Sequence, residues 1–155
     1  MRPLFTSRAS AIAAAALAGI VVGLASVPLL GYALAVVLPQ GFIAPFRAAG
    51  ALGAGLFLWD LIIYFVPGPG FLALGALLLL FRYTRQPRVL VVASFTASVL
   101  VAMYVLVPAL YGQALGPALN RPWYGYSFEV MLLVAALLAT ALSKRFFATR
   151  QVSSV

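Results

Sequence analysis

The sequence predicts an all-α integral membrane protein: one helical bundle that crosses the bilayer four times or, in an alternative arrangement, five times. Three observations support this fold class. Hydrophobic residues make up 65% of the 155-residue chain and charged residues 8%, whereas soluble domains are about half apolar and a quarter charged. The apolar residues gather in runs long enough to span a bilayer. The basic residues stand at the ends of those runs, where they orient membrane helices.

The composition excludes several kinds of site. The chain has no cysteine and no histidine, which removes disulfides, thiol chemistry, histidine-ligated haem and the common zinc sites. Its two acids, Asp60 and Glu129, cannot build a carboxylate-rich metal cage. The net charge of +8 comes from residues at helix ends, not from a basic face interleaved with aromatics, so we expect no nucleic-acid partner. We also expect no enzyme activity, no metal and no cofactor.

The first membrane helix is predicted over residues 9–38. The basic segment 1–8 precedes it, but the apolar run is longer than the core of a signal peptide. We therefore interpret it as a retained helix, kinked near Pro28. Gly19 and Gly23 belong to a stripe of small residues that lets helices approach closely. An alanine-rich composition alone would also produce such a stripe.

A second helix is predicted over residues 48–66, after a loop at 39–47 that contains two prolines and a glycine. This helix carries Asp60. It ends at a segment that we call the PGPG break, which consists of Pro67, Gly68, Pro69 and Gly70. The apolar run 71–81 that follows is too short to span alone. It could be a re-entrant half-helix, a continuation of the preceding helix past the break, or a short crossing.

Two further helices are predicted, over residues 89–111 and 127–147, with a polar and aromatic loop at 112–126 between them. The loop at 82–88 carries three arginines, and the positive-inside rule places it in the cytoplasm. We favour four crossings, with both termini cytoplasmic, over five crossings with the amino terminus outside. Both arrangements put the 82–88 loop and the carboxyl terminus on the cytoplasmic side of the cell's inner (plasma) membrane.

A weak internal repeat supports four crossings. Arg8 is followed twenty residues later by Pro28, and Arg88 is followed twenty residues later by Pro108, each within a Val-Pro pair. Two copies of a helical hairpin in the same orientation would give this pattern, and parallel repeats occur in transporters. Chance matches in alanine- and valine-rich sequence would give it as well.

Three charged residues form the candidate intramembrane polar site. Asp60 is costly inside a membrane helix, so it could be an ion or proton site, a counter-charge, or a structural hydrogen bond to a neighbouring helix. Glu129 lies near a helix amino terminus, where the macrodipole favours it. Arg47 lies at the start of the second helix, where the macrodipole disfavours a cation. It could meet an anionic substrate, an anionic lipid or Glu129. The PGPG break could coordinate ions through freed backbone groups or be a tight turn.

Residues 39–58, PQGFIAPFRAAGALGAGLFL, resemble the segment that opens the second helix of TctB-type proteins, the small membrane subunits of tripartite tricarboxylate transporters. Gly70-Phe71 with the apolar run, basic loop and helix that follow is similar to the last two helices of that family. The chain departs from it by lacking a hydrophilic loop after the second helix, by its short run at 71–81 and by the extra helix at 127–147. The resemblance implies a four-helix accessory subunit beside a large transport subunit and a periplasmic binding protein, and it transfers no substrate site to any residue.

We therefore expect a non-enzymatic accessory subunit of a transport assembly that packs against a larger permease subunit through its glycine- and alanine-rich faces. The expected partners are membrane lipids and that larger subunit, or further copies of this chain. One alternative is a stand-alone oligomeric transporter or channel with Asp60 near its pathway. Others are an accessory subunit of another membrane complex and, least favoured, a lipid-modifying enzyme.

Overall fold

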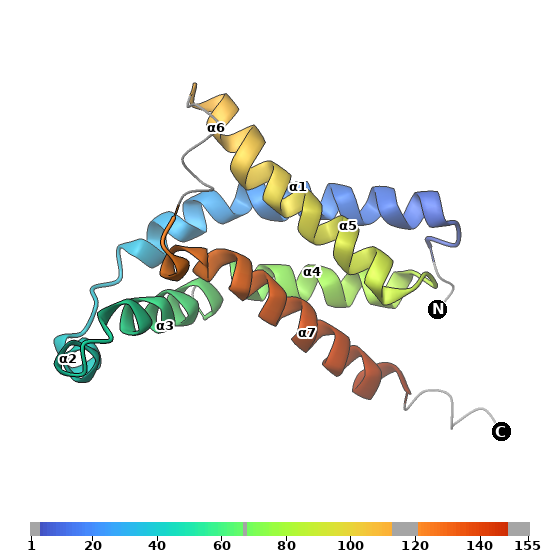
Figure 1. The fold of residues 1–155 in the computed structure, drawn as a ribbon. Helices are drawn as coiled ribbons and strands as arrows, with labels where there is room; N and C mark the ends of the chain where they lie inside the picture. The colour runs from blue at the N-terminus through green and yellow to red at the C-terminus, as the bar shows by residue number, and fades with distance from the viewer. Residues whose placement is uncertain (1–3, 67, 113–120, 149–155) are drawn as a thin grey trace.

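The computed structural model describes residues 4–66, 68–112 and 121–148. These residues form helices and one isolated β-bridge between Phe5 and Thr84, which confirms the predicted all-α class. Figure 1 shows the arrangement of the helices. Two short segments of the described chain are the π-helix η1 and the 3₁₀-helix η3. In chain order they are α1 (Arg8–Leu34), α2 (Gln40–Ala48), α3 (Leu52–Phe65), α4 (Pro69–Tyr83), α5 (Arg88–Val101), η1 (Ala102–Leu106), α6 (Val107–Leu110), η3 (Trp123–Tyr126) and α7 (Ser127–Ala148).

Several of these helices are long and apolar enough to cross a membrane. In the described part of the chain, three stretches meet this standard alone, namely Arg8–Leu34, Arg88–Leu110 and Trp123–Arg145. The pair α3 and α4 meets it together, with a bend of 53° at the break between them. The bundle therefore has three candidate spans, or four if the bent pair is one span, and it fits a multi-pass membrane protein.

Several predicted boundaries are wrong. Residues 39–47 are not a loop, because α2 occupies Gln40–Ala48 and the next helix begins only at Leu52. α1 ends at Leu34 rather than 38, with Pro28 inside it. α4 covers 15 residues and starts at Pro69, so it is longer than the predicted run at 71–81. The aromatic end of the predicted 112–126 loop is η3, and residues 113–120 lie outside the described residues.

α2 forms despite its two prolines because its buried side has a partner. The Pro39 carbonyl accepts hydrogen bonds from the backbone N–H groups of Phe42 and Ile43. Ile43 is 1% exposed, and a Cβ added at Gly55 of α3 would lie 2.6 Å from its Cδ1 atom. Gly50, at a φ of +68°, allows the turn between α2 and α3. The short helix is thus held by its packing on α3.

The closest helix contact joins α1 to α5, which both start at the end of the bundle where the amino terminus lies (Figure 1). A Cβ added at Gly19 would lie 2.5 Å from the backbone oxygen of Phe95, and one at Gly23 would lie 2.5 Å from the Cβ of Ala102. Only glycine permits backbones to approach this closely. The small-residue stripe predicted for the first helix is therefore occupied by a neighbouring helix of the same chain.

The core lies between α1, α4, α5 and α7. Its buried side chains come from all four helices and are small or apolar. The outward faces are apolar too, since Leu17 is 65% exposed and Val89 is 80% exposed. This pattern suits a bundle surrounded by lipid. The larger core residues are Val22, Leu77, Leu80, Phe81, Val91, Phe95, Val99, Phe128, Met131 and Leu132.

The amino-terminal segment is tied to the loop before α5. The backbone N–H groups of Leu4 and Phe5 donate to the Tyr83 carbonyl at 3.0 and 3.1 Å. The Gln86 side chain donates to the Thr6 carbonyl at 2.7 Å. We call this contact the amino-terminal latch. It places residues 4–6 and the 82–88 loop at the same end of the bundle, and α2 lies at the opposite end (Figure 1).

We expect Gly19→Ala to destabilise the protein by about 1–3 kcal/mol, because the new methyl group has no space against the α5 backbone. Gly75→Ala is the matched control, since Gly75 lies inside α4 with nothing within 4 Å of an added Cβ. The control should be neutral or up to about 1 kcal/mol more stable through helix propensity. Thermal unfolding of the purified variants in mild detergent measures both effects. If the two variants melt at the same temperature, the close α1–α5 contact is wrong.

Candidate functional site

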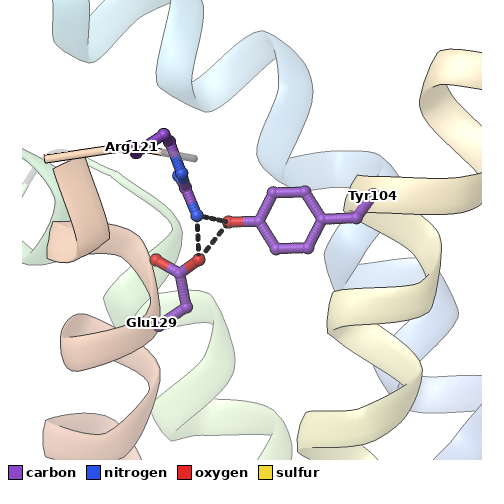
Figure 2. Close-up of polar contacts among 3 residues, drawn as sticks. All are labelled: Tyr104, Arg121 and Glu129. Atoms are coloured by element: carbon purple, nitrogen blue, oxygen red, sulfur yellow. Dashed lines mark hydrogen bonds and ion pairs between the residues drawn. The ribbon is translucent and has the colours of Figure 1, made fainter. Parts of the chain in front are cut away.

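A polar cluster joins three elements near the start of α7 (Figure 2). We call it the α7 polar cluster; it consists of Tyr104, Arg121 and Glu129. The Tyr104 hydroxyl donates to Glu129 Oε1 at 2.5 Å, and Arg121 Nη2 donates to the same oxygen at 2.5 Å. Arg121 Nη2 also donates to the Tyr104 hydroxyl at 3.2 Å. The three side chains therefore form a closed triangle of hydrogen bonds.

Each member of the cluster is placed by its local structure. Glu129 lies in the first turn of α7, where the helix dipole stabilises a negative charge, as the sequence predicted. Tyr104 lies in η1, a π-helical segment, and such segments often occur at functional sites. Arg121 lies before η3, with its guanidinium 4.7 Å from the centre of the Tyr126 ring. A Cβ added at Gly125 would come within 3.2 Å of the Arg121 side chain, so the glycine leaves room for it.

The cluster is half-buried and charged. The Arg121 and Glu129 side chains are 27% and 26% exposed. Burial lowers the pKa of Arg121, but its hydrogen bonds to Glu129 and Tyr104 outweigh that effect and leave the pKa above its usual value. Arg121 therefore stays cationic. The second oxygen of Glu129, Oε2, is buried and has no hydrogen-bond partner among the described residues.

Asp60 lies on α3 and contacts the same end of α7. The Ser127 hydroxyl donates to Asp60 Oδ2 at 3.2 Å, and Ser127 is 3% exposed. Tyr64, one turn further along α3, also interacts with Ser127. Asp60 therefore makes a structural hydrogen bond to a neighbouring helix, which is one of the three roles that the sequence suggested for it. Its roles as an ion or proton site and as a counter-charge stay predictions.

Arg47 does not join this cluster. It is exposed and lies in the last turn of α2, where the helix dipole favours a cation. The prediction that the dipole disfavours Arg47 is wrong because the helix boundary moved. Its pairing with Glu129 is also wrong, since Arg121 forms that ion pair. Contacts of Arg47 with an anionic substrate or lipid stay predictions.

The PGPG break is packed rather than open where the structure describes it. Gly68, Pro69 and Gly70 are buried, and Pro67 is not among the described residues. A Cβ added at Gly68 would lie 2.6 Å from the backbone oxygen of Tyr64. Pro69 occupies the first position of α4, where its fixed φ suits a helix start. The geometry is that of a tight bend, and ion coordination by this segment stays a prediction.

A groove of about 500 Å³ lies between α5 and α7. We call it the α5–α7 groove. Arg88, the first residue of α5, and Glu129, in the first turn of α7, both line it. The two helices run in opposite directions (Figure 1), so these charges lie toward opposite ends of the groove. The apolar side chains that line it are Val89, Val92, Ala93, Leu133, Ala136 and Leu137.

No family model matches this chain, and neither a curated protein nor a solved structure matches it. The resemblance of residues 39–58 to TctB-type proteins therefore stays a prediction from the sequence. What the chain does has to be argued from its own residues.

The sequence pointed to both acids of the chain, Asp60 and Glu129, and missed their partners. Neither Arg121 nor Tyr104 was among the residues that the sequence singled out. A signal existed for Arg121, because it and Glu129 carry opposite charges at the two ends of a short aromatic segment. No comparable signal marked Tyr104, whose position depends on the π-helical turn.

We expect Tyr104→Phe to destabilise the protein by about 1 kcal/mol, because it removes the hydroxyl that donates to Glu129 and accepts from Arg121 and leaves the ring in place. Tyr111→Phe is the matched control, since Tyr111 is 70% exposed and should tolerate the change. Thermal unfolding in detergent measures both variants. Combining Tyr104→Phe with Glu129→Gln should cost less than the sum of the single changes. Additive costs would contradict a shared cluster.

Proposed function

We propose that this protein is a small accessory subunit of a transport assembly in the inner (plasma) membrane, held against a larger permease subunit. The observation that carries the proposal is that both acids bond within the chain: Asp60 with Ser127, and Glu129 with Arg121 and Tyr104. These bonds tie α3, η1 and the segment before η3 to α7. Acids that serve a transport pathway face a cavity or the substrate. Glu129 lines the α5–α7 groove, but its Oε1 atom is bonded to Arg121 and Tyr104, so both acids hold the helices of the bundle together.

The surface of the bundle supports a role beside a larger protein. In the apolar 18-residue windows of the three candidate spans, only 28%, 22% and 39% is buried inside the chain. The Gly19–Gly23 face is already used against α5, so a partner would need another smooth face. Gly75 offers one, because it is exposed on α4 between the exposed side chains of Phe71 and Leu79 and has open space in front of it. A partner helix could approach closely there.

In the proposed topology the chain crosses the membrane four times, with α3 and α4 forming one broken span. Both termini and the 82–88 loop are cytoplasmic. The amino-terminal latch supports this arrangement, because it joins Leu4 and Phe5 to Tyr83. A five-crossing chain would separate those residues by the thickness of the bilayer. The arginines of the 82–88 loop support the cytoplasmic assignment.

The resemblance of residues 39–58 supports an assembly of the tripartite tricarboxylate type, with a large transport subunit and a periplasmic binding protein. The bend between α3 and α4 favours a second candidate, a stand-alone oligomeric transporter or channel. Asp60 lies within two turns of that bend, and broken helices line the binding sites of many transporters. An accessory role in another membrane complex is the third candidate.

Single cysteines can test the topology cleanly, because the chain has none of its own. We expect Leu4→Cys and Arg85→Cys to resist a membrane-impermeant maleimide in intact cells and to react after the membrane is opened. Gly41→Cys, on α2 at the other end of the bundle, should react in intact cells. Reaction of Leu4→Cys from outside, with Arg85→Cys protected, would instead establish five crossings.

The subunit proposal is tested by purification in mild detergent through a carboxyl-terminal tag, followed by mass spectrometry. We expect one large multi-pass permease in stoichiometric amount. Gly75→Leu should reduce its recovery at least about tenfold, because the new side chain fills the smooth face of α4. Gly31→Leu is the control, since Gly31 is also exposed with nothing within 4 Å. A homo-oligomer without a partner would refute the subunit role and favour the second candidate.

A further inference from the structure

We propose that the α5–α7 groove binds one acyl chain of an acidic phospholipid from the cytoplasmic leaflet, with the phosphate of its headgroup at Arg88. The site goes beyond the accessory role. It depends on the membrane topology proposed above and does not depend on the identity of any partner protein.

The walls of the groove suit a hydrocarbon chain. Six of its lining side chains are apolar, and Leu133 and Leu137 are exposed on the α7 side. The Thr140 hydroxyl, which could have made the wall polar, donates to the Ala136 carbonyl at 2.8 Å. The other hydroxyl in the lining is that of Thr96 on α5, so an acyl chain in the groove would meet mainly methyl and methylene groups.

The length of the groove matches one leaflet. Its α7 side extends from Glu129 to Thr140 and its α5 side from Arg88 to Thr96. At 1.5 Å per residue these sides are roughly 16 and 12 Å long. One leaflet contributes about half of the ~30 Å hydrocarbon core. A chain that enters beside Arg88 would thus reach the bilayer midplane near the far end of the groove.

Charge sets the direction in which the lipid enters. Arg88 is held with its guanidinium 5.8 Å from the centre of the Phe81 ring. Within the described residues no carboxylate forms an ion pair with it, since Glu129 is paired with Arg121 and Asp60 bonds Ser127. An anionic phosphate would complement this cation. At the other end of the groove the charge of Glu129 is already balanced by Arg121, so the headgroup belongs at the Arg88 end.

A lipid chain fits the groove better than a partner helix does. The 500 Å³ of the groove can take in an acyl chain along its length, whereas a helix about 10 Å wide would lie mostly outside it. An acyl chain is far narrower and can follow a groove between two diverging helices. The groove and the smooth face at Gly75 on α4 are therefore separate surfaces for separate partners.

The test uses the purified full-length chain in mild detergent and native mass spectrometry. The protein is titrated with phosphatidylglycerol and with phosphatidylcholine of identical acyl chains. We expect one phosphatidylglycerol to bind about fivefold more tightly than phosphatidylcholine, which is the contribution of one basic side chain beside an anionic lipid. Arg88→Gln should remove this preference. Lys144→Gln is the control, because Lys144 is a cation at the same end of the bundle and does not line the groove, and it should retain the preference.

A second pair of variants tests the groove itself. Ala93→Phe fills the groove and should abolish the bound lipid, whereas Ala97→Phe, one turn further on the same exposed side of α5, should leave it bound. Both alanines are exposed, so neither change disturbs the core.

Inorganic phosphate should not displace the lipid, because the acyl chain of the lipid contributes to binding. The proposal is overturned if phosphatidylcholine binds equally well, if Arg88→Gln and Lys144→Gln behave alike, or if Ala93→Phe and Ala97→Phe behave alike.

Discussion

The contact between α1 and α5 is the constraint on which the rest of the bundle depends. Helices in lipid gain nothing from leaving water, so their association depends on close packing and a few polar bonds. Gly19 and Gly23 bring the backbone of α1 against that of α5, and this pair becomes one wall of the bundle. The pair formed by α4 and α7 completes the core. α5 packs on α1 and diverges from α7 along part of its length. The α5–α7 groove lies where these two helices diverge.

The sequence was a good guide to whatever depends on composition and periodicity. It predicted the all-α class, the long apolar helices near 9–38, 89–111 and 127–147, and the interruption at the PGPG break. It failed where tertiary contacts decide the outcome. α2 forms at two prolines because Ile43 has Gly55 to pack against, and no local pattern shows that contact. The start of α4 differs for a local reason, because Pro69 occupies its first position and the fixed φ of proline suits a helix start.

The candidate site shows the same division. Asp60 and Glu129 could be found from the sequence because acids are rare in membrane helices. Their partners depend on the angles between helices and on a segment outside them. Tyr104 reaches Glu129 from the π-helical η1, and Ser127 reaches Asp60 from the first residue of α7. The interpretation of Arg47 failed because it depended on a helix boundary that the sequence did not determine.

The amino-terminal latch has a consequence for the order in which the chain is assembled in the membrane. Leu4 and Phe5 are made well before the Tyr83 carbonyl that accepts their hydrogen bonds, which follows almost eighty residues later. In the proposed topology, the segment before α1 therefore has no partner for these two hydrogen bonds until the α3–α4 pair has been made. When these hydrogen bonds form, they join the segment before α1 to the end of α4. A fusion partner attached at the amino terminus would crowd this latch, whereas one attached after α7 would leave it free to close.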